Sequence, residues 1–335
     1  MLLCLLCWGS WAALFKAAKK YRFELFYFDF GFGLALVALV CALTFGSLGY
    51  DGFKFTDDLL NARKQEWLYG FLAAMIFNFG NMLLLAAVSV AGLSTAFPLA
   101  FGVAMVVGGW MNYMNHPDGS SMILVCGTIL ILVSIVLGSS GYSHLRVLQH
   151  EAQARAGKTK STRRPTSIKG TVLACVSGLV MGLFSPLLVR AQDPDVGVGP
   201  YALLFIFAGA VVISTFVFNL FFMNLPVEGD PLEIADFIKP PVTNHLFGLA
   251  GGVVWGIGAI AYFVVGTPKS AEHMNEPLFS ILAQGAPLVA GLLGLLLFKE
   301  LKEGDLRVKA FRVVTLLLFG VGLIAFSYAP VWGAR

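Results

Sequence analysis

Long apolar runs, repeated along almost the whole chain, constrain this sequence more than any other feature. The hydrocarbon core of a bilayer is about 30 Å thick, and a helix needs about 20 apolar residues to cross it. On that measure the 335 residues contain ten candidate spans, at 1–18, 25–46, 67–91, 94–113, 121–140, 168–189, 200–223, 244–266, 276–298 and 308–328. The chain is therefore predicted to be a polytopic membrane protein of the all-α class.

Composition excludes the soluble classes. Hydrophobic residues make up 58% of the chain and charged residues 13%, whereas a soluble domain carries about 25% charge. The 5 cysteines all lie in apolar runs, and an odd number at that depth does not indicate a disulfide framework. The sequence contains no HExxH, GxSxG or metal-spaced His/Cys cluster, so an enzyme has no support. We expect no cofactor, no metal site and no nucleic-acid partner.

One long polar segment interrupts the apolar pattern near the middle of the chain. Residues 141–169 hold seven Lys and Arg residues and no hydrophobic stripe that could bury a core. We interpret this segment as a solvated linker. It divides the chain into a first five-span repeat at 1–140, a basic cytoplasmic linker at 141–167 and a second five-span repeat at 168–335.

The distribution of basic residues predicts the orientation. The connections after spans 1, 3, 5, 7 and 9 hold 17 Lys and Arg, and the opposite side holds 6. Because basic residues collect on the cytoplasmic side, the linker is expected in the cytoplasm and both termini outside. The expected location is the plasma (inner) membrane.

Five spans in each half imply that the second half enters the membrane in the opposite orientation, which is the inverted-repeat plan of secondary transporters. The sequence similarity between the halves is faint. CWGSWAAL at 7–14 is similar to VMGLFSPL at 180–187, with Gly9 matching Gly182. Glycines four residues apart, Gly178 with Gly182 and the series at 248, 252 and 256, predict close helix packing.

Polar and aromatic residues at membrane depth are candidates for solute binding, because such groups tend to face a bundle interior or a cavity. The candidates are Trp8, Ser10, Trp11, Asn78, Asn81, Trp255 and Gln284. Indole rings stack on flat solutes, and amides offer both donors and acceptors. The alternatives are an interfacial aromatic belt for the tryptophans and interhelical hydrogen bonds for the asparagines.

Three carboxylates are candidates for proton coupling. Asp29 lies about one helical turn deeper in span 2 than Glu24, and Glu276 lies at the outer entrance of span 9. The alternative for the first two is an interfacial acid paired with Arg22 or Lys20. The alternative for Glu276 is a solvated rim.

Prolines inside two spans are expected to break the helix and free carbonyl groups. Pro287 lies in span 9, and Pro98 is expected to play the equivalent part in span 4.

Several of these segments resemble the drug/metabolite transporter superfamily. They are LCWGSW (6–11), KYRFELFYFD (20–29), LTFGSLG (43–49), GNMLL (80–84) and GLSTAFP (92–98). Within that superfamily the chain is most similar to the branch of rhamnose–proton symporters, glucose/ribose porters and ureide permeases. The resemblance implies ten helices in two inverted five-helix repeats, a central solute cavity and alternating access.

The sequence thus predicts a proton-coupled secondary transporter that imports a small neutral polar solute, a monosaccharide such as rhamnose or glucose, or a ureide such as allantoin. Its partners would be that solute, the lipid bilayer and a proton or other coupling ion, with the oligomeric state left open. A drug or metabolite exporter of the same fold is the alternative. A membrane scaffold without transport is a third hypothesis.

Overall fold

The computed structural model describes residues 1–18, 20–48, 54–115, 117, 119–156, 168–193, 196–266 and 275–332. This part of the chain contains helices and their connections and no strand. The helices are α1 (Leu2–Ala17), α2 (Phe23–Leu43), η1 (Phe45–Ser47), α3 (Phe55–Asn61), α4 (Lys64–Ala91), α5 (Leu93–Asn115), α6 (Ser121–Arg155), α7 (Ile168–Gly182), α8 (Ser185–Ala191), α9 (Pro200–Asn224), η2 (Ile234–Ile238), α10 (Val242–Val265), α12 (Glu276–Gln284), α13 (Ala286–Leu296) and α14 (Leu306–Tyr328).

Nine helical segments of the described chain are long and apolar enough to cross a membrane, and α1 is a shorter apolar helix of 16 residues. α7 with α8, and α12 with α13, each form one such segment with an internal break. Apart from α6, the helix ends agree with the expected spans to within a few residues. The all-helical, polytopic membrane class is confirmed.

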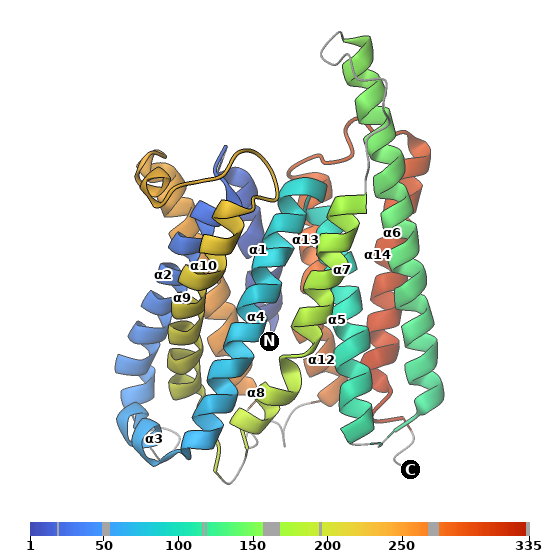
Figure 1. Ribbon diagram of the computed structural model, residues 1–335. Coiled ribbons are helices and arrows are strands. Elements are labelled where there is room, and N and C mark those ends of the chain that lie inside the picture. Colours follow the sequence, from blue (N-terminus) through green and yellow to red (C-terminus); the bar gives the residue numbers. More distant parts are fainter. Residues whose placement is uncertain are drawn as a thin grey trace.

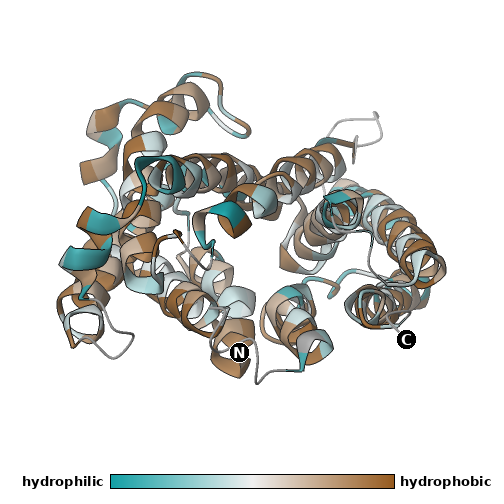
Figure 2. Cartoon of the chain, turned by 90° about the horizontal axis from the view of Figure 1, so that it is seen from below, coloured by the Kyte–Doolittle hydropathy of each residue, from teal (hydrophilic) through white to brown (hydrophobic). Residues whose placement is uncertain are grey.

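Figure 1 shows the long helices side by side, with their axes running from the top to the bottom of the view. α6 projects at the top, where the connections at 225–241 and 297–305 also lie, and we call this the linker side. α3, α8 and the C-terminus lie at the bottom, which we call the far side. In the end-on view of Figure 2, most of the helical ribbon is hydrophobic and hydrophilic residues gather at helix ends and connections.

Helix packing follows a definite pattern. α1 packs on α10 and α13, α2 packs on α9 and α10, and α4 packs on α7 and α9. α5 packs on α7 and α13, and α6 packs mainly on α14. Every long helix of the first half therefore contacts the second half.

Glycines form a close seam between α2 and α10. A Cβ atom added to Gly33 would collide with the backbone oxygen of Leu249, and one added to Gly252 would collide with the backbone oxygen of Phe30. Gly256 lies against Val37 in the same seam. The close packing expected for the glycine series of α10 is confirmed.

α6 is longer than expected, because it continues through residues 141–155, which were predicted to belong to a solvated linker. Gly141, Tyr142 and Leu145 are buried, and the Tyr142 hydroxyl donates to Val90 O at 3.1 Å. Gly141 and Leu145 lie four residues apart on the face that meets α14, where a Cβ atom on Gly141 would lie 3.0 Å from Phe311 Cβ, so the helix continues to Arg155 in spite of its polar composition. Residues 157–167 lie outside the described part of the chain.

The two proline sites behave differently. The helical segment of span 9 breaks at Gly285, two residues before Pro287, as expected. The prediction for Pro98 is wrong, because α5 continues through it. Proline has no N–H for the carbonyl four residues earlier, Ser94 O. Arg312 Nη1 donates to this oxygen at 2.7 Å, which replaces the missing bond and allows the helix to continue.

Candidate functional site

An aromatic cluster lies where α1, α4, α9 and α10 meet. The indole rings of Trp8 and Trp255 stack with centroids 5.8 Å apart and planes inclined by 19°. Phe77 and Phe207 pack on Trp255 at 4.8 and 5.7 Å, and Tyr262 packs on Trp8 at 5.2 Å. The structure thus brings together two expected solute-binding residues from the two halves of the chain.

Gly258 makes room for Trp8 in this cluster. A Cβ atom at position 258 would lie 2.7 Å from Trp8 Cδ1, well inside the usual carbon–carbon separation of about 3.5–4.0 Å. Trp8 Nε1 is buried without a hydrogen-bond partner among the described residues. An unpaired buried donor costs about 1–3 kcal/mol, so this N–H is a favourable place for a polar atom of a ligand.

The ring spacing limits how a flat solute can bind. A flat solute between two parallel rings needs about 3.5 Å on each side, or about 7 Å in total. The Trp8 and Trp255 centroids are only 5.8 Å apart. The two rings therefore stack on each other in this arrangement. Insertion of a solute between them requires α1 and α10 to move apart.

Ser10 and Trp11 lie beside the cluster and not in it. Trp11 is buried and packs on Phe30 with centroids 4.9 Å apart, and Phe30 in turn contacts Trp255 at 6.2 Å. The Ser10 hydroxyl donates to Cys7 O of its own helix at 3.5 Å. Trp11 is thus joined to the cluster through Phe30, whereas the described contact of Ser10 is local.

Asn78 and Asn81 are fully buried and hydrogen-bonded to neighbouring helices. Asn78 Nδ2 donates to Ser214 Oγ at 2.8 Å and to Thr215 Oγ1 at 3.0 Å, both on α9. Asn81 Nδ2 donates to the Tyr27 hydroxyl on α2 at 3.0 Å. The alternative of interhelical hydrogen bonds therefore describes both amides in this arrangement. Asn78 Oδ1 is buried and has no partner within the described chain.

Gln284 belongs to a different polar group. Its Nε2 donates to Ser280 Oγ at 2.9 Å, and Ser327 Oγ of α14 donates to the same hydroxyl at 3.0 Å. The described contacts of Gln284 therefore do not include the aromatic cluster. Glu276 is the first residue of α12, and its side chain lies outside the described part of the structure.

Asp29 is the centre of a hydrogen-bonded triad at the linker end of α2. Asp29 Oδ2 accepts from the Tyr21 hydroxyl at 2.5 Å and lies 3.0 Å from His245 Nδ1 of α10. The Tyr21 hydroxyl and His245 Nδ1 are 3.1 Å apart. Burial and the Asp29 carboxylate raise the pKa of Tyr21, so its hydroxyl keeps its proton and acts as a donor.

Glu24 is paired with Arg22, as the alternative for an interfacial acid proposed. Glu24 is fully buried, and its Oε1 lies 2.5 Å from Arg22 Nη2. Asn219 Nδ2 of α9 donates to the backbone oxygen of Glu24 at 2.7 Å. This fixed pair leaves Asp29 as the better candidate for proton coupling.

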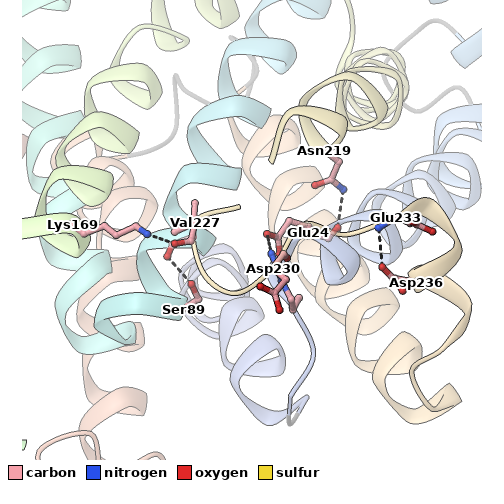
Figure 3. A network of polar contacts seen from close by, with 10 residues as sticks. Glu24, Ser89, Lys169, Asn219, Val227, Asp230, Glu233 and Asp236 are labelled. Atoms are coloured by element: carbon pink, nitrogen blue, oxygen red, sulfur yellow. Dashed lines mark hydrogen bonds and ion pairs between the residues drawn. The ribbon is translucent and has the colours of Figure 1, made fainter. Parts of the chain in front are cut away.

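The connection at 225–241, which we call the strap, crosses the linker ends of the helices (Figure 3). Arg22 Nη1 donates to Asp230 O at 2.5 Å, and Lys169 donates to Val227 O. Phe237 of the strap packs edge-on against the His245 ring at 4.7 Å. The strap is therefore attached to α2, α7 and α10.

A second set of charges, Lys16, Glu300 and Arg312, forms what we call the charged knot. Glu300 accepts from Lys16 Nζ at 2.7 Å and from the backbone N–H groups of Leu93 and Ser94 at 2.8 and 2.9 Å. Burial alone would raise the pKa of Glu300, but Lys16 and the donors at the start of α5 outweigh it and hold this pKa below its usual range. Arg312 joins the charged knot through Ser94, because its Nη1 donates to Ser94 O, and it is only 1% exposed.

The sequence reading missed Tyr21, His245 and the charged knot. His245 lies at the start of the predicted span 244–266, and an ionisable residue within a span is itself a signal of function. Arg312 is one of the 17 basic residues assigned from the sequence to the cytoplasmic connections, yet it is buried, where its Nη1 donates to the Ser94 oxygen that Pro98 leaves without a partner. In the described chain no group of three or more His, Cys, Asp and Glu side chains could hold a metal ion.

Comparisons with known proteins bear on this geometry. No protein-family model matches the chain. The chain is similar to Ureide permease 1, Ureide permease 2 and Ureide permease 5 of Arabidopsis thaliana, with identities of 21%, 22% and 23%. The alignments cover 96%, 95% and 98% of this chain and 94%, 92% and 93% of those proteins.

A solved crystal structure that is 14% identical matches with a TM-score of 0.50 over 96% of this chain and 93% of that one, a likeness of fold alone. The curated relatives are permeases, which are transporters and not enzymes, and they match over nearly their full length. Together with the apolar helices, this similarity supports an integral membrane protein that transports small solutes. The protein is not an enzyme.

Proposed function

We propose that this protein is a proton-coupled secondary transporter that imports a small neutral polar solute by alternating access. Similarity to ureide permeases supports a ureide such as allantoin as the solute. A monosaccharide such as rhamnose or glucose is the alternative. The observation that carries the proposal is the aromatic cluster, because it joins the two halves and holds a buried indole N–H with no hydrogen-bond partner in the described part of the chain.

The chemistry of the cluster suits a flat solute with both donors and acceptors. Ureides carry planar amide groups, which stack on indole faces, and carbonyl oxygens, which accept from an N–H such as Trp8 Nε1. Asn78 Oδ1 supplies an acceptor on α4 that has no partner among the residues the structure describes. The cluster itself contains no cationic residue, so a strongly anionic solute would lack a partner.

The packing pattern supports two inverted repeats and ten membrane crossings. In this arrangement each helix of the first half has a counterpart in the second half. In chain order, α1, α2, α4, α5 and α6 correspond to α7, α9, α10, α12–α13 and α14. The contact of α1 with α10 then becomes that of α7 with α4, and α2 with α10 becomes α9 with α4. The contact of α1 with α13 becomes that of α7 with α5. The pairs α2–α9, α5–α13 and α6–α14 each map onto themselves.

Gly9 and Gly182, which match when the two halves are compared in sequence, also lie in equivalent contacts and so support the two repeats. A Cβ atom on Gly182 would lie 2.7 Å from Val107 Cβ and 3.1 Å from Ala104 O. A Cβ atom on Gly9 would meet the same two atom types, Val289 Cβ and Ala286 O, on the corresponding helix of the other half. In both cases the valine follows the alanine by three residues. The two repeats in this proposal are residues 1–140 and 168–335.

The proposed orientation places the linker side in the cytoplasm and the far side outside, in the plasma (inner) membrane. Its support is the excess of Lys and Arg in the connections of the linker side. In this orientation, Asp29 would take up the coupling proton near the cytoplasmic end of α2. Glu24 is less suited to this role because Arg22 already neutralises it.

The test is uptake into proteoliposomes with an imposed pH gradient, comparing labelled allantoin with labelled monosaccharides. Gradient-driven accumulation of either solute supports import, and accumulation that a protonophore does not abolish contradicts proton coupling. Extrusion of the solute in the same system would favour the exporter.

Substitution of Trp8 tests the site directly. Stacking of a flat nucleic-acid base on an aromatic side chain is worth about 1–3 kcal/mol. A loss of about 1.4 kcal/mol corresponds to a factor of ten, so Trp8→Ala should weaken allantoin binding about tenfold. Trp110→Ala is the matched control, because Trp110 bonds to Thr128 in the contact of α5 with α6. Equal affinities for the two variants would remove Trp8 from the site.

A further inference from the structure

We propose that His245 completes the proton-binding site with Asp29, so that the coupling proton is loaded onto a histidine–aspartate pair between α10 and α2. This inference rests on the proposed function, because it names the group that takes up the proton. His245 belongs neither to the aromatic cluster nor to the charged knot.

The geometry is that of a direct pair. His245 Nδ1 lies 3.0 Å from Asp29 Oδ2 and 3.2 Å from Oδ1. The Tyr21 hydroxyl donates to the same carboxylate, which leaves Nδ1 as the other donor to it. A histidine that donates through Nδ1 takes up an added proton at Nε2.

The glycine seam holds the two partners in place. Gly248 follows His245 by three residues on α10 and therefore shares its helix face. A Cβ atom on Gly248 would lie 2.5 Å from Asp29 Cβ and 2.9 Å from Asp29 Oδ2. The Asp29 side chain thus lies directly on the α10 backbone, and the distance between the partners is fixed by helix packing.

The neighbouring charges do not neutralise the pair. On α2 and the residue before it, Glu24 and Arg22 bond to each other. On the strap, Asp236 and Lys239 bond to each other at 2.5 Å, and the remaining charged residues, Glu228, Asp230 and Glu233, are acids that cannot neutralise a negative charge. With His245 neutral and Asp29 ionised, the pair therefore carries one uncompensated negative charge.

Loading a proton makes the pair electrically neutral. The proton goes to Nε2 of His245, because the Asp29 carboxylate already accepts hydrogen bonds from the Tyr21 hydroxyl and from His245 Nδ1. A net charge is costly to bury, but a hydrogen-bonded imidazolium–carboxylate pair is far less so. The loaded pair can therefore be enclosed during the transport cycle, and the unloaded pair must stay in contact with water.

The surroundings leave a route for this exchange. The Tyr21 ring and Phe237 of the strap both contact the imidazole edge-on, at 5.6 and 4.7 Å. The His245 side chain nevertheless remains 24% exposed, against 9% for Asp29. His245 is thus the member of the pair through which protons exchange with the linker side.

The experiment is gradient-driven uptake of labelled allantoin into proteoliposomes by the full chain. A gradient of one pH unit can drive about tenfold accumulation of a neutral solute that moves with one proton. We expect His245→Gln, which cannot be protonated, to accumulate no allantoin and to show no allantoin-induced proton influx with an internal pH dye. Exchange of labelled for unlabelled allantoin at equal pH should persist at a lower rate.

The matched control is His144→Gln. His144 also pairs with an aspartate, Asp305, at 3.1 Å, but this pair lies nearer the surface, with side chains 33% and 46% exposed. This variant should accumulate allantoin like the wild type. If His245→Gln accumulates allantoin like the wild type, this inference is wrong and the proposed function is unaffected. If the variant loses exchange as well as accumulation, this inference is also wrong. A wild-type protein that moves neither allantoin nor a monosaccharide would overturn the proposed function and this inference with it.

Discussion

Glu300 is a carboxylate held almost entirely by groups that lie far away in the sequence. Lys16 is 284 residues away, and the two backbone donors of α5 are more than 200 residues away. Gly92 permits this contact, because it has φ of +83° and a Cβ atom there would lie 2.7 Å from the carboxylate carbon. A favourable site for the ionised form is thus assembled from three parts of the chain.

The lowered pKa of Glu300 predicts how the knot responds to acid. A group whose folded pKa lies below its unfolded value stabilises the protein above the unfolded value, and this stabilisation disappears as the pH falls through the folded value. We expect Glu300→Gln to lower the free energy of unfolding by about 1–3 kcal/mol at pH 7. The difference in melting temperature from wild type should shrink below about pH 4.3.

Melting curves in detergent between pH 7 and pH 3.5 check this prediction. Glu303→Gln is a suitable control, since Glu303 is an exposed acid of the same connection. A difference between wild type and Glu300→Gln that stays constant over the whole range would contradict the assigned role of the charge.

Single residues were the part of the site that the sequence predicted least completely. Trp8, Trp255 and Asp29 stood out because aromatic and acidic groups at membrane depth are unusual. The partners of Asp29 did not, since hydrogen bonds across 8 and 216 residues depend on how the helices pack. The amides of Asn78 and Asn81 illustrate the same limit, because the sequence could not decide between a solute and a neighbouring helix.

At the scale of elements, glycine seams decide which helices approach closely. Gly252→Ala on α10 would place a methyl group against Phe30 O and 2.7 Å from Leu34 N, both backbone atoms of α2. Because neither atom can move independently of its helix, we expect a loss of about 1–3 kcal/mol in stability. Thermal unfolding of the purified protein measures it.

Gly209→Ala provides the comparison for this substitution. A Cβ atom at position 209 meets no described atom within 4 Å, and alanine favours a helix over glycine by about 1 kcal/mol. The stability of this variant should equal or exceed that of the wild type. Equal losses for Gly252→Ala and Gly209→Ala would show that the seam has no energetic role.

The positions of the elements were largely predictable, because a bilayer requires a minimum length of apolar helix. The exceptions have physical causes. α6 extends past its expected end because a few apolar residues on one face suffice to pack it on α14. α5 survives Pro98 because Arg312 supplies the missing donor. Neither cause is visible in a hydropathy pattern.

At the scale of the whole molecule, the proposed orientation makes opposite predictions for the two faces. Asn61 ends α3 on the far side, and Glu303 lies between α13 and α14 on the linker side, and both are exposed. In intact cells, a membrane-impermeant maleimide should label Asn61→Cys and should label Glu303→Cys only after permeabilisation. The unsubstituted protein gives the background from its own cysteines, and the reverse pattern would invert the topology.

The number of spans and their charge bias were sufficient to propose this arrangement of two halves. The contacts between the halves could not be derived in the same way. The pairing of Trp8 with Trp255 and the equivalence of α1–α13 with α7–α5 emerge only when the helices are assembled.

The glycine seams also bear on how far such a protein can diverge. Outward positions of α2 such as Leu36, Val40 and Leu43 are exposed, and at membrane depth any apolar side chain serves there equally well. The seam positions accept almost nothing larger than hydrogen. A saturation library selected for function should therefore tolerate free exchange among apolar residues on the lipid face and purge nearly every replacement at Gly33 and Gly252. Changes among the apolar residues of the lipid face would therefore alter the sequence of such a protein while its helix packing stays the same.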